Sequence, residues 1–148
     1  MLAWHYTTGH CLDAIIATGF LRPATAGVPA NERPVLWFSL QQDFEPTALK
    51  GIIADGVRRR ATLDEMMIFG DGLARLGIEP RRLLRGEALR TRARIARPMW
   101  SALVAVAREQ GADPADWCGY VGALPLSDLI VERRSADVPE WTRINVVM

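Results

Sequence analysis

The chain has 148 residues, of which 49% are hydrophobic and 24% are charged, and its formal net charge is +1. This length fits one domain, 1–148, which buries enough surface to fold without a disulfide or a metal. The composition excludes disordered, collagen-like and fibrous proteins. The sequence has no apolar run of about 18 residues, and its first residues lack the pattern of a signal peptide. We therefore expect a cytoplasmic protein with no membrane partner.

The basic residues are concentrated in the middle of the chain. Residues 58–97 hold eleven arginines against five acidic residues, whereas both flanking segments are acidic. Seven of these arginines fall within 81–97, where they could attract phosphate-bearing ligands. The alternative is a solvated charged face or a flexible loop, and the lack of aromatic residues between the arginines favours it.

Cysteine and histidine are scarce. Cys11 and Cys118 are the only cysteines, and His5 and His10 are the only histidines. No CxxC motif and no histidine cluster is present, so we expect no metal site. Because the chain carries no secretion signal, two reduced, buried thiols are favoured over a disulfide.

The first forty residues predict two strands, over 2–7 and 35–40, with a helix between them over 9–19. Threonine and glycine residues before the helix supply cap chemistry, and Gly19 is a natural stop. Three prolines and a glycine mark 23–34 as a surface loop. The early part of the chain thus alternates strand, helix and strand.

A second helix is predicted over 46–57, because Pro46 suits a first helical position and apolar residues follow at helical spacing. Its apolar positions are Leu49, Ile52, Ile53 and Val57. Thr62 and Glu65 have the spacing of a capping box, which predicts a short helix to about Phe69, with a strand as the alternative.

The second half of the chain predicts one long helix among strands. A turn at 70–72 precedes a strand over 73–79, and a helix runs from Pro98 to a C-terminal cap at Gly111. Three further strands are predicted within 117–124, 127–134 and 141–147. The fold class expected is therefore α+β, with helices early and in the middle and strands at both ends.

The clearest chemical signal lies at the end of the first strand. The sequence contains no phosphate-binding P-loop, no GxGxxG fingerprint and no GxSxG elbow. His5 and Thr7 are two residues apart on a strand, so they share a face and could grip the hydroxyls of a ribose. The alternative is a histidine whose hydrogen bonds are satisfied within the sheet.

Several motifs near the N-terminus occur in a familiar order. His-Tyr-Thr at 5–7, an amphipathic helix, the loop and the Trp-Phe-Ser of the second strand follow one another within about residues 2–40. This order resembles the ADP-ribosyltransferase-like superfamily, in particular its branch of bacterial DNA-targeting toxins, HYD1-type toxin domains and RNA 2′-phosphotransferases. The resemblance implies a small split β-sheet with flanking helices and NAD as substrate.

The resemblance also implies roles for individual residues. His5, Tyr6 and Thr7 would contact NAD, and Ser39 would match the serine of the second strand. Separately, an arginine of 81–97, with Arg82 as the candidate, could contact the pyrophosphate, because a guanidinium fork matches its oxygens. An aromatic residue would stack on nicotinamide, for which the chain offers Tyr120, Phe38, Trp37 and Phe44.

The catalytic glutamate of the superfamily has two main candidates here, Glu45 and Glu132, and Glu140 is a weaker third. Glu45 stands before Pro46, where it could instead interact with a helix N-terminus. Glu132 could instead be a strand residue paired with an arginine. The sequence leaves the choice open.

The expected function is cleavage of the nicotinamide glycosidic bond of NAD and transfer of ADP-ribose to an unknown acceptor, with a toxin-like role and a neutralising partner protein. Two alternatives remain. One is a transferase of the same fold that acts on RNA phosphate, and the other is a non-enzymatic interaction module that lacks the glutamate.

Overall fold

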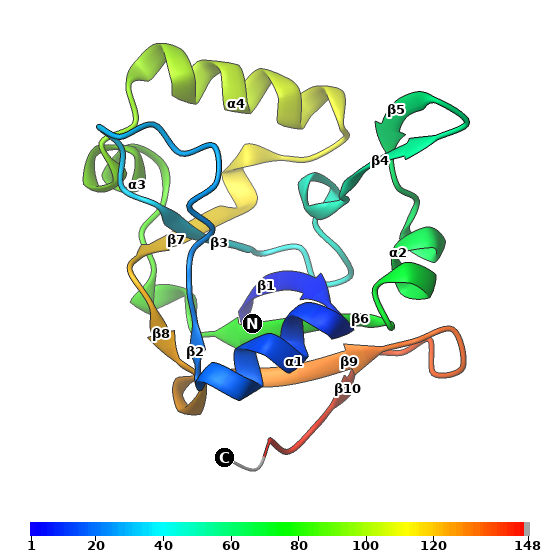
Figure 1. Ribbon diagram of the computed structural model, residues 1–148. Coiled ribbons are helices and arrows are strands. Elements are labelled where there is room, and N and C mark those ends of the chain that lie inside the picture. The colour runs from blue at the N-terminus through cyan, green and yellow to red at the C-terminus, as the bar shows by residue number, and fades with distance from the viewer. Residues whose placement is uncertain (147–148) are drawn as a thin grey trace.

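Six antiparallel strands form the central sheet of the computed structural model, which describes residues 1–146 (Figure 1). Their order across the sheet is β10–β9–β6–β1–β3–β7. With four helices around the sheet, the fold is α+β, as the sequence predicts. The bounds of the strands are β1 (Ala3–Thr8), β3 (Val35–Ser39), β6 (Leu73–Ile78), β7 (Trp117–Val121), β9 (Ile130–Arg134) and β10 (Thr142–Arg143).

The remaining elements surround this sheet. The helices are α1 (Gly9–Thr18), α2 (Leu63–Phe69), α3 (Gly86–Ala93) and α4 (Arg97–Glu109). Two small two-stranded sheets pair β2 (Phe20–Leu21) with β8 (Leu124–Pro125) and β4 (Gly51–Ala54) with β5 (Val57–Arg60). Short 3₁₀ turns occupy Pro46–Ala48, Pro80–Arg82, Pro114–Asp116 and Leu126–Asp128. Within residues 1–146, none of the helices is long and apolar enough to cross a membrane.

Local signals account for the helices that the sequence predicts correctly. The Thr8 side chain caps the N-terminus of α1 by accepting from the Cys11 amide, and Gly19 ends that helix in the left-handed conformation, at φ 77°. In α2 the Thr62 side chain accepts from the Glu65 amide, and the Glu65 side chain accepts from the Thr62 amide. The predicted capping box is therefore confirmed.

The helix predicted over 46–57 is wrong. The segment forms a 3₁₀ turn and then the β4–β5 hairpin, in which Ala54 pairs with Val57. Asp55 and Gly56 connect the strands with φ values of 52° and 74°. Positive φ at both central residues is the signature of a type I′ hairpin turn, for which Asp-Gly is a preferred sequence. The turn chemistry thus outweighed an apolar spacing that also fits a helix.

The predicted boundaries of the later strands also need correction. The strand expected over 127–134 begins only at Ile130, because 126–128 form a 3₁₀ turn. Within the predicted strand 141–147, only β10 is regular, and Val147 lies outside the described residues. The arginine-rich segment 81–97 contains α3, a short helix of low hydrophobicity with most of its arginines exposed.

The two faces of the sheet are covered by different helices. On one face, Leu12 of α1 joins a core with Ala74, Leu76 and Phe38. On the other face, Leu89 of α3 packs with Val35 and other residues of β3 and the α3–α4 connection. Figure 1 shows α1 in front of the sheet, whereas α4 and the β4–β5 hairpin lie at the top of the view. All six residues of β6, the third strand across the sheet, are buried.

The pairing of β1 is uneven. It pairs with β6 through six consecutive residues, but with β3 only at Trp4 and Ser39. Beyond that pair β1 and β3 diverge, and the sequence motifs that carry the resemblance lie on these two strands. Residues of both strands line the cleft described below.

Candidate functional site

A cleft of about 720 Å³ lies between the sheet and α4. Its size falls within the roughly 300–1,000 Å³ of small-molecule and cofactor sites. The β1 and β3 strands form its floor, α4 forms one wall, and residues of the loop before β3 also line it. The residues of the strands that line it include Trp4, His5, Tyr6, Trp37, Phe38, Ser39 and Trp117.

A buried polar pair lies at the floor of this cleft. The Ser39 hydroxyl donates to Oε1 of Glu45 at 3.0 Å, and these two residues are 1% and 6% exposed. The other carboxylate oxygen of Glu45 accepts from the amide and the hydroxyl of Thr47, at 3.0 and 2.7 Å. Glu45 also caps the 3₁₀ turn at Pro46–Ala48. This is the interaction with a helix N-terminus that the sequence allowed as the alternative to a catalytic role.

His5 lies where β1 and β3 diverge. Its Nδ1 atom is 2.8 Å from the carbonyl oxygen of Trp37, so Nδ1 carries a hydrogen and donates it. Burial lowers the pKa of His5, against the opposing effect of that hydrogen bond. The imidazole is therefore neutral near pH 7, with Nε2 as a hydrogen-bond acceptor. The Phe38 ring meets the imidazole edge-on, with 5.9 Å between ring centroids.

The α4 wall of the cleft is apolar. Met99, Leu103 and Val106 line it and remain exposed to solvent. Trp100 of α4 forms an aromatic cluster with Trp37 and Trp117, with centroid distances of 5.7 to 6.2 Å. Flat aromatic side chains next to a polar floor suit a ligand with planar rings.

Within the described part of the chain, Arg33 is the one arginine or lysine that lines the cleft. Its amide donates to the Ala93 carbonyl at 2.8 Å, which ties the loop before β3 to the end of α3. Sequence reasoning missed Arg33 because it stands alone in a loop and belongs to no motif. The α4 wall carried a signal, since Met99, Leu103 and Val106 recur at helical spacing on one face.

Arg82 lies outside this cleft. Its guanidinium pairs with Asp128 at 3.1 Å. It lines a second, open depression between α3 and β7, together with Tyr120 and Arg92. Most other arginines of 81–97 also have partners on the chain, such as Arg90, which pairs with Glu87 at 2.5 Å.

Glu132 is likewise absent from the lining of the cleft. It lies on β9 opposite Arg75 of β6, and the two side chains form an ion pair of 2.5 Å. This pairing is the alternative that the sequence allowed for Glu132. Glu140 is exposed and precedes the half-buried Trp141. Of the three candidate glutamates, Glu45 is the one that the fold brings next to Ser39.

Tyr6 and Thr7 point to opposite sides of β1. The Tyr6 hydroxyl donates to the Gln41 carbonyl, and its ring lies 5.0 Å from that of Phe44. Burial raises the pKa of Tyr6 to about 12, although Arg75 opposes this shift. Thr7 shares the face of His5 but is not among the residues that line the cleft.

Both cysteines are free thiols, as the sequence predicts, but only Cys118 is buried as expected. Cys118 is buried, and burial raises its pKa. Cys11 is half-buried in the first turn of α1, with Lys50 Nζ 3.7 Å from its sulfur. Burial by itself raises the pKa of the Cys11 thiol, but hydrogen bonds with Thr8 and Thr7 and the charge of Lys50 together lower it.

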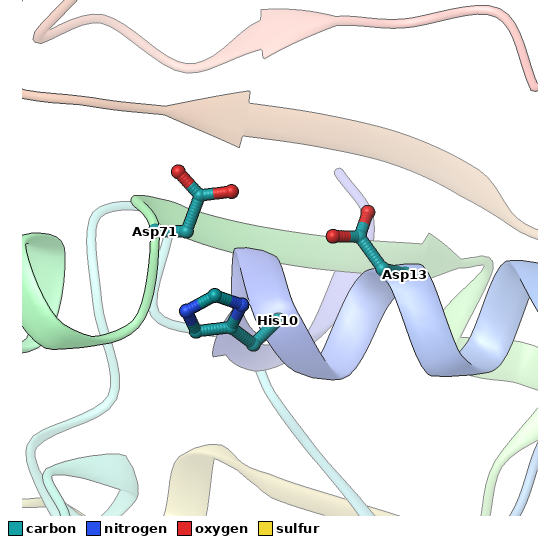
Figure 2. A group of neighbouring side chains, drawn as sticks. All are labelled: His10, Asp13 and Asp71. Atoms are coloured by element: carbon teal, nitrogen blue, oxygen red, sulfur yellow. The ribbon is translucent and has the colours of Figure 1, made fainter.

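His10, Asp13 and Asp71 form a small cluster at the start of α1, with ligand atoms within 4.8 Å of one another (Figure 2). All three residues are exposed, and the Arg133 guanidinium lies 3.8 Å from Asp71. The positive end of the helix dipole and this arginine both oppose a bound cation. Chemically, the three side chains are a weak candidate for a metal.

Comparisons with protein-family models, with curated proteins and with solved structures find no match to this chain.

Proposed function

We propose that the cleft binds NAD as a substrate, and that the protein cleaves its nicotinamide–ribose bond and transfers ADP-ribose to an acceptor. The observation that carries this proposal is that His5, Ser39 and Glu45 all line one cleft of dinucleotide size, in which Ser39 is hydrogen-bonded to Glu45. These residues come from the motifs whose order resembles ADP-ribosyltransferase-like proteins. A neutral imidazole and a buried carboxylate are the groups needed to hold a ribose and to stabilise positive charge.

The proposed reaction breaks the bond between the nicotinamide nitrogen and C1′ of the ribose, and the electron pair leaves with nicotinamide. Positive charge develops on the ribose, where the Glu45 carboxylate stabilises it. The acceptor then forms the new bond to C1′ and releases its proton to that carboxylate. Nε2 of His5 accepts a hydrogen bond from a ribose hydroxyl and orients the sugar. Ser39 holds Glu45 in place.

Arg33 is the proposed contact for the pyrophosphate. A guanidinium offers paired donors that match phosphate oxygens, and Arg33 lines the cleft, whereas Arg82 pairs with Asp128 elsewhere. We therefore expect Arg33→Gln to weaken NAD binding about ten-fold or more. Arg82→Gln is expected to leave NAD binding unchanged, which would correct the sequence-based assignment of Arg82 to the pyrophosphate.

Thermal shift with NAD, ADP-ribose and nicotinamide tests binding, because a ligand of the folded state raises its stability. Release of nicotinamide, followed by chromatography, tests cleavage. We expect Glu45→Gln to keep the NAD-dependent shift and to lower the rate at least 100-fold. His5→Ala should reduce the shift. If millimolar NAD neither stabilises the protein nor is consumed, the proposal is wrong.

A second candidate function is a binding module without catalysis. Glu45 accepts three hydrogen bonds from its own chain, as a purely structural carboxylate would. In that case ADP-ribose or NAD would still stabilise the protein, but Glu45→Gln would change nothing in a nicotinamide-release assay, because wild type would release none.

A further inference from the structure

The segment that joins Ser39 to Glu45 is held in an unusual way. Three successive backbone carbonyls, those of Gln41, Gln42 and Asp43, each accept a hydrogen bond from a side chain outside the segment. The donors are the Tyr6 hydroxyl, Nη1 of Arg75 and Nε1 of Trp141, the last at 2.8 Å. These donors come from β1, from β6 and from the segment before β10.

Arg75 is the centre of this arrangement. It is 8% exposed, and its guanidinium lies 3.9 Å from the Trp4 ring and 4.6 Å from the Trp141 ring. The side of the guanidinium that does not face Gln42 binds Glu132, through Nε at 2.8 Å and Nη2 at 2.5 Å. Glu132 thereby fixes the plane of the guanidinium, so that Nη1 is directed at the Gln42 carbonyl.

A buried ion pair adds little net stability to a sheet, because burying the charges costs free energy. Removing both charges from water costs several kcal/mol per ion, and apolar residues of similar volume often stabilise a fold better. A fixed guanidinium directs a hydrogen-bond donor at one carbonyl, which apolar residues cannot do. The carbonyl in question belongs to the segment that sets the distance between Ser39 and Glu45.

We propose that Tyr6, Arg75, Glu132 and Trp141 form a loop clamp that positions the Glu45 carboxylate at the floor of the cleft. Glu132 is then a positioning residue that acts on Glu45 through Arg75 and segment 41–43. This inference rests on the proposed function of Glu45. It gives Tyr6 and Glu132, expected from the sequence to act on NAD directly, an indirect role in the same reaction.

The clamp matters because catalysis depends on geometry more steeply than folding does. A displacement of about 1 Å at a reacting group can lower a rate 100-fold while the protein stays folded. Neither Arg75 nor Glu132 lines the cleft, so neither of them holds the substrate in this arrangement. Loosening the clamp is therefore expected to lower kcat and to leave the KM for NAD nearly unchanged.

The test uses Glu132→Gln and Arg75→Lys in the full chain, with Glu87→Gln as the matched control. Glu87→Gln removes one partner of an ion pair of the same 2.5 Å length, on the exposed surface of α3. We expect each clamp variant to lower kcat about 10- to 100-fold, with the KM for NAD within about two-fold of wild type. The double variant should lose little more than either single variant, because both act through one contact.

Amide hydrogen exchange of residues 41–48 provides a readout that does not depend on catalysis. Faster exchange there in both clamp variants, and not in Glu87→Gln, supports the clamp. Unchanged exchange at 41–48, or a kcat equal to that of wild type in a folded variant, overturns it. If wild type does not cleave NAD, the proposed function fails, and hydrogen exchange alone then decides whether the clamp holds this segment.

Discussion

Ser39→Ala isolates the hydrogen bond on which the floor of the cleft depends. The hydroxyl of Ser39 donates to a carboxylate oxygen of Glu45 at 3.0 Å, and both residues are buried. Hydrogen bonds to charged groups contribute about 1.5–3 kcal/mol to stability. We therefore expect Ser39→Ala to lower the free energy of unfolding by about 2 kcal/mol. The Gln41 amide, which donates to the same hydroxyl at 3.1 Å, loses its acceptor as well.

Urea denaturation followed by tryptophan fluorescence measures this change. With a slope of about 2 kcal/mol per molar urea, the midpoint should fall by about 1 M. The exposed Ser101 of α4 offers the matched control, because Ser101→Ala should change stability by no more than about 0.5 kcal/mol. The comparison separates loss of the buried hydrogen bond from the general effect of replacing serine with alanine.

A double-mutant cycle with Glu45→Gln tests whether the effect comes from this pair. In the Glu45→Gln background the acceptor is neutral, so Ser39→Ala should cost only about 1 kcal/mol. The two substitutions should therefore be coupled by about 1 kcal/mol. Additive effects, or a Ser39→Ala variant as stable as wild type, would refute the reasoning that the hydroxyl and the carboxylate hold each other.

Two further predictions concern stability. Gly77→Ala would place a Cβ atom 2.5 Å from Cζ3 of Trp4, so we expect a loss of about 1–3 kcal/mol in urea denaturation, whereas Gly51→Ala, which meets no atom within 4 Å, should lose far less. Burial lowers the pKa of His5 below its ordinary 6.5, so the unfolded chain binds a proton more readily than the folded one. Stability should therefore decline as the pH falls below 6.5 toward the lowered pKa. His5→Gln should abolish this decline between about pH 7.5 and about pH 5.5, and His10→Gln should preserve it; a decline that survives His5→Gln would contradict the assignment.

Local signals in the sequence explain the elements that were predicted correctly. Thr8 and Gly19 bound α1, and Thr62 with Glu65 starts α2, because caps act within a few residues. The β4–β5 hairpin was also encoded locally, by Asp55 and Gly56. The sequence analysis predicts a helix there instead, because the apolar residues of 46–57 recur at helical spacing and the turn signal is only two residues long.

Local signals in the sequence do not determine which candidate glutamate lies beside Ser39. The sequence identifies His5, Ser39 and Glu45 as candidates, but it also identifies Glu132, which lies nearer in sequence order to where the resembled superfamily carries its glutamate. The choice depends on which side chains meet across the sheet. Glu132 faces Arg75, 57 positions away along the chain, and no local pattern encodes that contact.

The sequence by itself determined the helices whose ends are capped and the α+β class. It also determined a short list of candidate polar site residues near the N-terminus. Only the tertiary structure decided that Ser39 and Glu45 share one cleft with His5, that Arg33 rather than Arg82 lines it, and that α4 forms its wall. The physical reason is that caps and turns are short-range, whereas a cleft is made by packing elements that are far apart along the chain. The uneven pairing of β1, with six residues of β6 but only one of β3, is likewise a feature of the tertiary structure.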